Sequence, residues 1–188
     1  HHALDSYLPK LVRYGFRVAI CDQLEDPKSV KGIVKRGVTE LVTPGVSLND
    51  NVLDKQSNNY LASVFFNDNE AGVAFLDVST GEFSLSTGSH IYIENLVQSF
   101  SPSEILYPRP QRAIFTEKFG EKCIQYGQED WIYTVEYGYE KLIRHFKTSS
   151  LKGFGVENLK EGIIAAGAIL HYLEETEHKE ISHISSIS

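Results

Sequence analysis

The segment 60–86, YLASVFFNDNEAGVAFLDVSTGEFSLS, carries the strongest indication of fold class in this chain. Three short runs rich in β-branched and aromatic residues, 60–66, 71–78 and 82–86, are separated by turn formers at 67–69 and 79–81. Short connections of this kind join neighbouring antiparallel strands. The segment is therefore predicted to form a three-stranded antiparallel meander.

Helices and strands alternate after this meander. Apolar residues follow helical spacing in 91–100, and a short apolar strand is expected over 104–107. We then expect a weak helix over 113–119, a strand over 122–126 and a helix over 139–146. The order is that of an RNase H-like fold, an α/β layer architecture.

The last helix has the clearest pattern. Its apolar stripe consists of Leu159, Ile163, Ala166, Leu170 and Leu173. Asn158, followed three residues later by Glu161, predicts a capping box at its start. Gly167 lies on the apolar side and predicts close packing against a sheet, while the acidic run at 174–177 ends the helix in water.

The first 45 residues carry a weaker pattern. A helix is expected over 6–14, with Asp5 as its N-cap and Gly15 as its end, although Pro9 is tolerated only near the first turn. Short strands are expected over 16–21 and 38–42. Because these elements bury little on their own, they indicate the end of a domain whose first part is missing. Residues 43–59 then have the composition of a connector.

Charge and cysteine content exclude some classes of protein. Eighteen Lys and Arg oppose 25 Asp and Glu, and a formal net charge of -7 is the wrong sign for a chain whose whole surface wraps nucleic acid. Any DNA contact is expected to be local. No apolar run approaches the ~20 residues of a membrane span. Cys21 and Cys123 show no disulfide or metal-binding spacing, which indicates the cytoplasm, and Cys21 is expected to be packed within its strand.

An RNase H-like fold raises the alternative of a metal-dependent nuclease. Such an enzyme needs several carboxylates around two metal ions, and its first strand carries an Asp, which 60–66 lacks. The remaining acidic candidates are Asp77, Glu82, Glu94 and Glu104. Fold analogy alone does not supply a site, and Asp77 with Gly81 is expected to shape a turn instead.

Two further patterns have simpler explanations. His171, His178 and His183 are too widely spaced for one tetrahedral metal site and indicate a solvated helix end. Gly153 and Gly155 before a helix indicate a tight turn, with a phosphate-binding loop as the alternative.

Short sequence words resemble a known family in order and spacing. His2-Ala3-Leu4 through Lys10-Leu11-Val12, then 18–23, 26–27 and Val42-Thr43-Pro44-Gly45 resemble the second half of the mismatch-binding domain of the bacterial MutS family. Leu76-Asp77-Val78-Ser79-Thr80-Gly81, Gly153-Phe154-Gly155-Val156-Glu157-Asn158 and Ala165-Ala166-Gly167 resemble the connector domain of that family. The resemblance runs nearly end to end and identifies the chain as an internal MutS-family piece.

The resemblance implies a division of the chain. Residues 1–45 would end the mismatch-binding domain, 46–58 would be a linker, 59–178 would be the connector domain, and 179–188 would begin the next, core or lever, domain. The motif Gly153, Phe154, Gly155 and Asn158 would be structural.

The same resemblance implies where chemistry is absent and where partners bind. The family's Phe-x-Glu motif lies upstream of this chain, so Phe119-Gly120-Glu121 has no assigned role, and no phosphate loop ending in Gly-Lys-Ser or Gly-Lys-Thr is present. The fragment would be no enzyme and would hold no cofactor, whereas the full-length homodimer binds ATP, magnesium and mismatched double-stranded DNA.

Two surfaces are expected to bind partners. Basic residues in the first unit would contact the DNA backbone, with an ordinary solvated loop as the alternative: Arg36, Lys35, Lys31 and Lys28. The connector would relay ATP-driven movement and dock MutL on the outward side of a helix near Glu140 and Lys141, with a plain solvated face as the alternative.

Overall fold

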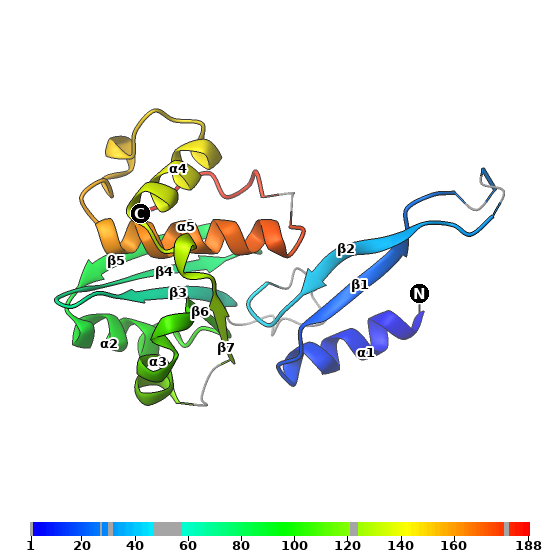
Figure 1. Ribbon diagram of the computed structural model, residues 1–188, viewed down its shortest axis with the longest axis horizontal. Coiled ribbons are helices and arrows are strands. Elements are labelled where there is room, and N and C mark those ends of the chain that lie inside the picture. Colours follow the sequence, from blue (N-terminus) through cyan, green and yellow to red (C-terminus); the bar gives the residue numbers. More distant parts are fainter. Residues whose placement is uncertain (1, 27, 30–31, 47–57, 121–123, 179–180) are drawn as a thin grey trace.

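The computed structural model describes residues 2–26, 28–29, 32–46, 58–120, 124–178 and 181–188. Figure 1 shows a helix and a two-stranded ribbon at one end and a sheet layered between helices at the other. Within the described residues, no helix has the length and apolar character needed to cross a membrane. The α/β class predicted from the sequence is confirmed.

The first unit consists of α1 (His2–Arg13), β1 (Val18–Gln23) and β2 (Arg36–Val42), with the two strands antiparallel. Leu8 and Val12 of α1 pack on Val42 of β2 and form its small core. The helix ends as predicted, because Gly15 adopts a φ of 86° and donates its N–H to Val12. Asp5 as N-cap was wrong, since the helix begins upstream of it and has Pro9 in its interior.

Cys21 is exposed, so the prediction of a packed cysteine was also wrong. The strand register shifts between Ile20 and Cys21, and every residue of β1 from Cys21 onward is exposed. The far half of the ribbon therefore has no core behind it. Cys123 lies outside the described residues.

The second unit is built on a five-stranded sheet with the order β5-β4-β3-β6-β7. Its strands are β3 (Tyr60–Phe66), β4 (Ala71–Asp77), β5 (Glu82–Gly88), β6 (Glu104–Pro108) and β7 (Ile124–Gln128). The pairs β3–β4 and β4–β5 are antiparallel, whereas β6 runs parallel to both β3 and β7. The predicted meander and the following crossover are confirmed.

Helices cover both faces of the sheet (Figure 1). On one face, α2 (His90–Phe100) and α3 (Arg112–Phe119) lie over an aromatic core that includes Phe66, Phe75 and Phe115. On the other face, α4 (Val135–Phe146) and α5 (Lys160–Glu175) lie over a larger aliphatic core. Helix α5 packs on β3, β4 and β5 and is buried over most of its length.

Glycines set the distance between α5 and its neighbours. A Cβ on Gly167 would lie 2.3 Å from the Cα of Gly138, so this glycine packs against α4 and not, as predicted, against the sheet. Gly162 contacts the sheet instead, where a Cβ would lie 2.8 Å from Leu85. The helices α4 and α5 and the sheet thus approach one another closely at glycines, which have no side chain to keep them apart.

The predicted capping box of α5 was wrong. Asn158 is exposed and Leu159, the N-cap residue, makes no side-chain cap. Thr87 of β5 accepts the N–H of Gly162 at 2.9 Å, and Glu161 accepts a hydrogen bond from Asn67 at 2.8 Å. One N–H of the first turn is therefore satisfied by the sheet, because this turn lies against Gly72 of β4 and Leu85 of β5.

The last residues pack on the second unit. Ile184 and Ile187 are buried in the core beneath α5. Leu85 of β5 donates its N–H to Ser188 at 2.9 Å, and Ser188 donates back to Phe83 at 3.2 Å. The division between 59–178 and 179–188 stays a prediction, but the described part of 179–188 contributes to the core of the sheet unit.

Candidate functional site at the joint between the two units

A buried carboxylate joins the two units. Glu104, the first residue of β6, is fully buried. Its Oε2 accepts hydrogen bonds from the Thr43 hydroxyl at 2.6 Å and from the Gly45 N–H at 3.0 Å. Its Oε1 accepts a hydrogen bond from the hydroxyl of Tyr172 on α5 at 2.6 Å. These donors replace the water that a buried carboxylate would otherwise need.

The segment that meets Glu104 directly follows β2. Residues 43–46 are all buried, and Val46 belongs to the aliphatic core. A Cβ on Gly45 would lie 2.8 Å from Leu61 and 2.9 Å from the Cβ of Glu104, so only glycine fits. The predicted linker 46–58 lies largely outside the described residues. The residues that lead into it, 43–46, are tightly packed against residues of the second unit such as Leu61 and Glu104.

Arg17 forms the second part of the joint. Its guanidinium lies 3.7 Å from the centroid of the Tyr126 ring on β7 and 5.4 Å from that of Tyr172. Burial opposes the charged form, yet the interactions with Tyr126, Tyr172 and Glu104 outweigh it and raise the pKa of Arg17. A cation of the first unit is therefore stacked on aromatic rings of the second.

The protonation state of Tyr172 is also determined by this joint. Burial, and then the neighbouring charge of Glu104, raise the pKa of Tyr172 well above its usual value. The phenol remains protonated at neutral pH and acts as the donor to Glu104. Tyr172 thus links α5 to the carboxylate and, through its ring, lies near Arg17.

A third contact joins the end of β2 to the end of α5. Leu41 donates its N–H to the Thr176 carbonyl at 3.2 Å, and Glu40 lies 3.5 Å from the Nε2 of His178. The Nδ1 of His178 is 3.0 Å from the Thr176 hydroxyl. Burial lowers the pKa of His178, although Glu40 and the backbone of Thr176 act in the opposite direction. Polar groups therefore also connect the end of β2 to the residues that follow α5.

The carboxylates considered for the nuclease alternative each have hydrogen-bond or ion-pair partners of their own. Both oxygens of Glu104 are engaged, and those of Asp77 accept hydrogen bonds from Asn59, Ser79 and Thr80. The other two carboxylates of the nuclease alternative have separate partners, Glu82 with Tyr60 and Glu94 with Lys118. In the described part of the chain, no three His, Cys, Asp or Glu side chains are placed to share a metal ion.

Asp77 and Gly81 instead shape the turn between β4 and β5, as predicted. The Oδ1 of Asp77 accepts hydrogen bonds from the N–H of Ser79 and of Thr80, and Gly81 adopts a φ of 78°.

Comparison with known proteins agrees with this division into two units. Residues 1–51 match the model of MutS domain I, and residues 59–185 match that of MutS domain II. The chain belongs to the MutS family. It is 62% identical over its whole length to the DNA mismatch repair protein MutS of Cytophaga hutchinsonii and 57% identical to that of Bacteroides fragilis. It spans 22% of the length of these relatives.

Three of the basic residues predicted to contact DNA, Lys28, Lys35 and Arg36, lie at the far end of the MutS domain I ribbon. Lys28, Lys35 and Arg36 are exposed, whereas Lys31 lies outside the described residues. The backbone N–H groups of Lys28 and Lys35 donate to the carboxylates of Asp26 and Glu25. Figure 1 shows this end of the ribbon projecting away from the sheet unit. Its DNA contact stays a prediction.

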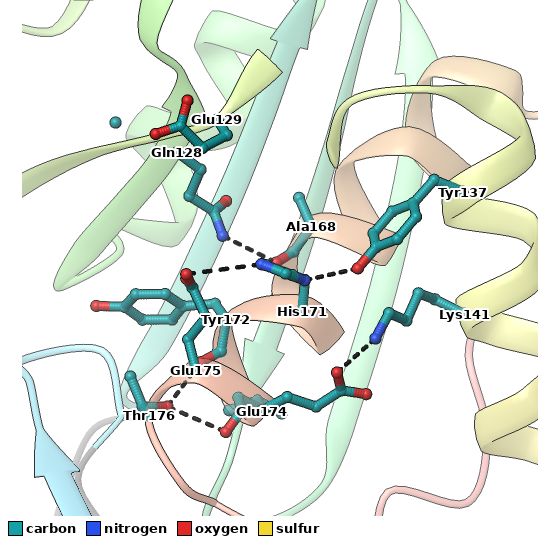
Figure 2. A network of polar contacts seen from close by, with 12 residues as sticks. Gln128, Glu129, Tyr137, Lys141, Ala168, His171, Tyr172, Glu174, Glu175 and Thr176 are labelled. Atoms are coloured by element: carbon teal, nitrogen blue, oxygen red, sulfur yellow. Dashed lines mark hydrogen bonds and ion pairs between the residues drawn. The ribbon is translucent and has the colours of Figure 1, made fainter. Parts of the chain in front are cut away.

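The predicted docking residues on α4 differ in exposure. Glu140 has a side chain that is 63% exposed and pairs with Arg144. Lys141 has a side chain that is only 12% exposed, because its ammonium pairs with Glu174 of α5 and lies 5.4 Å from the centroid of Tyr137 (Figure 2). Lys141 therefore bridges two helices, and its expected outward position was wrong.

The three histidines are not a solvated helix end, so that prediction was wrong too. His171 places Nδ1 2.6 Å from the hydroxyl of Tyr137 (Figure 2), and His178 is buried in the joint. His183 places Nε2 2.7 Å from the Val78 carbonyl. Each of the three histidines therefore contacts a different part of the chain.

The predicted structural motif forms a turn between α4 and α5. Gly155 adopts a φ of 77°, and Phe154 packs on Phe146 with ring centroids 4.8 Å apart. Glu157 and Asn158 line the hollow beside this turn. A carboxylate at that place disfavours the phosphate-binding alternative.

Sequence reasoning missed most of the joint. It considered Glu104 only as a nuclease carboxylate, and it assigned no role to Arg17, Tyr126 or Tyr172. One signal was available, since Glu104 is a charged residue that opens an otherwise apolar strand. The two aromatic partners have no comparable signal, because tyrosines are frequent throughout this chain.

Proposed function

We propose that this chain is the coupling part of a MutS mismatch-repair ATPase and has no enzymatic activity of its own. Domain I would contribute a weak DNA-backbone contact through its basic ribbon. Domain II would relay ATP-driven movement and dock MutL. ATP, magnesium, mismatched double-stranded DNA and the homodimer belong to the full-length protein, which we place in the bacterial cytoplasm, where chromosomal DNA is repaired.

The observation that carries the proposal is the buried carboxylate of Glu104. It receives two hydrogen bonds from the segment that ends domain I and a third from α5 of domain II. Moving one unit relative to the other breaks these bonds and leaves buried polar groups unpaired, which costs about 1–3 kcal/mol for each group. Such a joint transmits small displacements instead of absorbing them.

The relay is tested in full-length protein carrying Glu104→Gln, with Glu82→Gln as the matched control on the exposed end of β5. The side-chain amide of the first variant would place N–H donors where the carboxylate accepts hydrogen bonds from Thr43, Gly45 and Tyr172. We expect mismatch binding to persist in both variants, while ATP-dependent recruitment of MutL is impaired by Glu104→Gln alone. Unchanged recruitment in that variant contradicts the relay.

Docking is tested separately by capture of the N-terminal domain of MutL on the 188-residue chain. Glu140→Arg and Lys141→Glu are compared with the unaltered chain. Because Lys141 is engaged with Glu174, we expect Glu140→Arg to act directly and Lys141→Glu to act by loosening α4 from α5. Failure of the unaltered chain to bind at any salt concentration contradicts docking by this fragment.

The DNA contact is tested by the salt dependence of binding. The basic ribbon would neutralise few phosphates, so we expect weak affinity that falls with rising salt and falls further in Arg36→Glu. A sub-micromolar dissociation constant at physiological salt contradicts the proposal, because it would make the fragment a DNA-binding domain in its own right.

A further inference from the structure

The single tryptophan of the chain is more than half exposed. Trp131 is 56% exposed and lies in the short 3-10 turn Asp130–Ile132 between β7 and α4. The next residue, Ile132, is 1% exposed and fastens the turn to the core. The turn is therefore held in place while its tryptophan faces solvent. The exposed part of this large apolar side chain contributes nothing to the stability of the core.

Two other rings hold this tryptophan in place. The Trp131 ring stands nearly perpendicular to Tyr137 of α4 and His171 of α5, with centroid distances of 5.2 and 5.4 Å. The Tyr137 hydroxyl lies 2.6 Å from His171 Nδ1, and Glu175 lies 3.6 Å from Nε2 of the same ring (Figure 2). Tyr137, His171 and Glu175 thus form a connected network that supports Trp131, so the exposed ring is held in a fixed orientation before any partner binds.

Acidic side chains surround the rings of Trp131, Tyr137 and His171. Asp130 and Glu136 are exposed beside Trp131 and Tyr137 in the sequence. On α5, the side chains of Glu174 and Glu175 are 59% and 44% exposed. The nearby ammonium of Lys141 is already paired with Glu174. The local excess of carboxylates makes the surface attractive to cations and repulsive to DNA phosphates.

We infer that the Trp131 patch, defined as Trp131, Tyr137 and His171 with the rim Asp130, Glu136 and Glu175, docks an Arg- or Lys-bearing segment of a protein partner. An exposed, rigid tryptophan is the residue type most enriched at binding hot spots, and its face attracts a guanidinium or ammonium. A second copy of this chain would bring two acidic rims together, which disfavours self-association through the patch. The inference rests on the proposed docking of MutL and moves the centre of that surface from Lys141 to Trp131.

The single tryptophan supplies its own probe. The 188-residue chain labelled with 5-fluorotryptophan gives a fluorine NMR signal from Trp131 alone, and unlabelled MutL N-terminal domain adds none. We expect the signal to shift or broaden as that domain is added, and the effect to weaken as salt is raised. Binding shown by an independent method without any change in this signal overturns the inference.

Variants separate this inference from the proposed docking itself. We expect Trp131→Ala to raise the dissociation constant by about tenfold or more, whereas Tyr92→Ala, which removes an exposed aromatic from α2 on the opposite face, leaves it unchanged. Glu136→Lys should weaken binding, and Glu117→Lys on α3 should not. Binding that survives both Trp131→Ala and Glu136→Lys overturns the patch but leaves docking intact. Absence of binding by the unaltered chain overturns both.

Discussion

The ribbon of domain I and the sheet of domain II both contain antiparallel strand pairs, but different forces stabilise them. Domain II encloses aliphatic and aromatic cores on the two faces of its sheet. Among its described residues, the domain I unit has three buried apolar side chains in its own core and leaves Tyr14 83% and Ile33 97% exposed. It meets domain II at a joint that combines the hydrogen bonds of Glu104 and the cation–π contact of Arg17 with the burial of Val46.

The largest effect is expected at the close contact between α4 and α5. Gly167→Ala places a methyl group 2.3 Å from the Cα of Gly138, and the helices α4 and α5 must separate. We expect the free energy of unfolding to fall by about 3 kcal/mol. Urea denaturation measures it. Gly153→Ala is the control, because a Cβ there meets nothing within 4 Å, and equal losses in the two variants would contradict the close helix contact.

A smaller effect is expected from the buried phenol that connects the sheet unit to the joint. Tyr172→Phe removes the donor to Glu104 Oε1 and leaves a buried carboxylate oxygen unpaired. We expect a loss of about 2 kcal/mol in the free energy of unfolding. Tyr92→Phe, an exposed tyrosine on α2, should change stability by less than about 0.5 kcal/mol. Thermal and urea unfolding of the two variants make the comparison.

Removal of the stacked guanidinium should loosen the domain I unit and spare the sheet. Arg17→Lys keeps the charge but loses the planar group that lies over Tyr126. We expect a loss of about 1 kcal/mol, confined to the joint. Hydrogen exchange should become faster in β1 and β2 and remain unchanged in β3 and β4. Arg112→Lys, at an exposed position of α3, is the control, and a uniform change across both units would contradict a local role.

The smallest effect is expected from pH. Burial lowers the pKa of His178, so below about pH 6.5 the unfolded chain takes up a proton that the folded joint resists. Stability contributed by neutral His178 is therefore present above that pH and is lost as the pH falls. His178→Gln should flatten this part of the stability profile between pH 7.5 and 5.5. An unchanged profile in the variant would show that another group is responsible.

The sequence predicts the sheet unit well and the joint poorly. Its strands and helices have local signals, because alternating apolar residues and turn formers at 67–69 and 79–81 specify each element. The joint arises from residues far apart in the chain, such as Thr43 and Glu104, whose contact no local pattern encodes. The capping of α5 by Thr87 and the pairing of Lys141 with Glu174 were missed for the same reason.

Predictions of packing failed where burial depends on a distant neighbour. Cys21 lies in a strand of apolar pattern yet is exposed, as are the residues of β1 that follow it. His178 lies after an acidic helix end yet is buried, because the end of β2 covers it. In both cases the neighbouring sequence indicates the element correctly and the environment incorrectly.

The most direct test of the joint is hydrogen exchange in the 188-residue chain carrying Glu104→Gln. If Glu104 holds domain I against domain II, amides of β1 and β2 will exchange about tenfold faster or more than in the unaltered chain, while those of β3 and β4 will be far less affected. Equal protection of β1 and β2 in the two chains would contradict the account, because the first unit would then keep its place without the buried carboxylate.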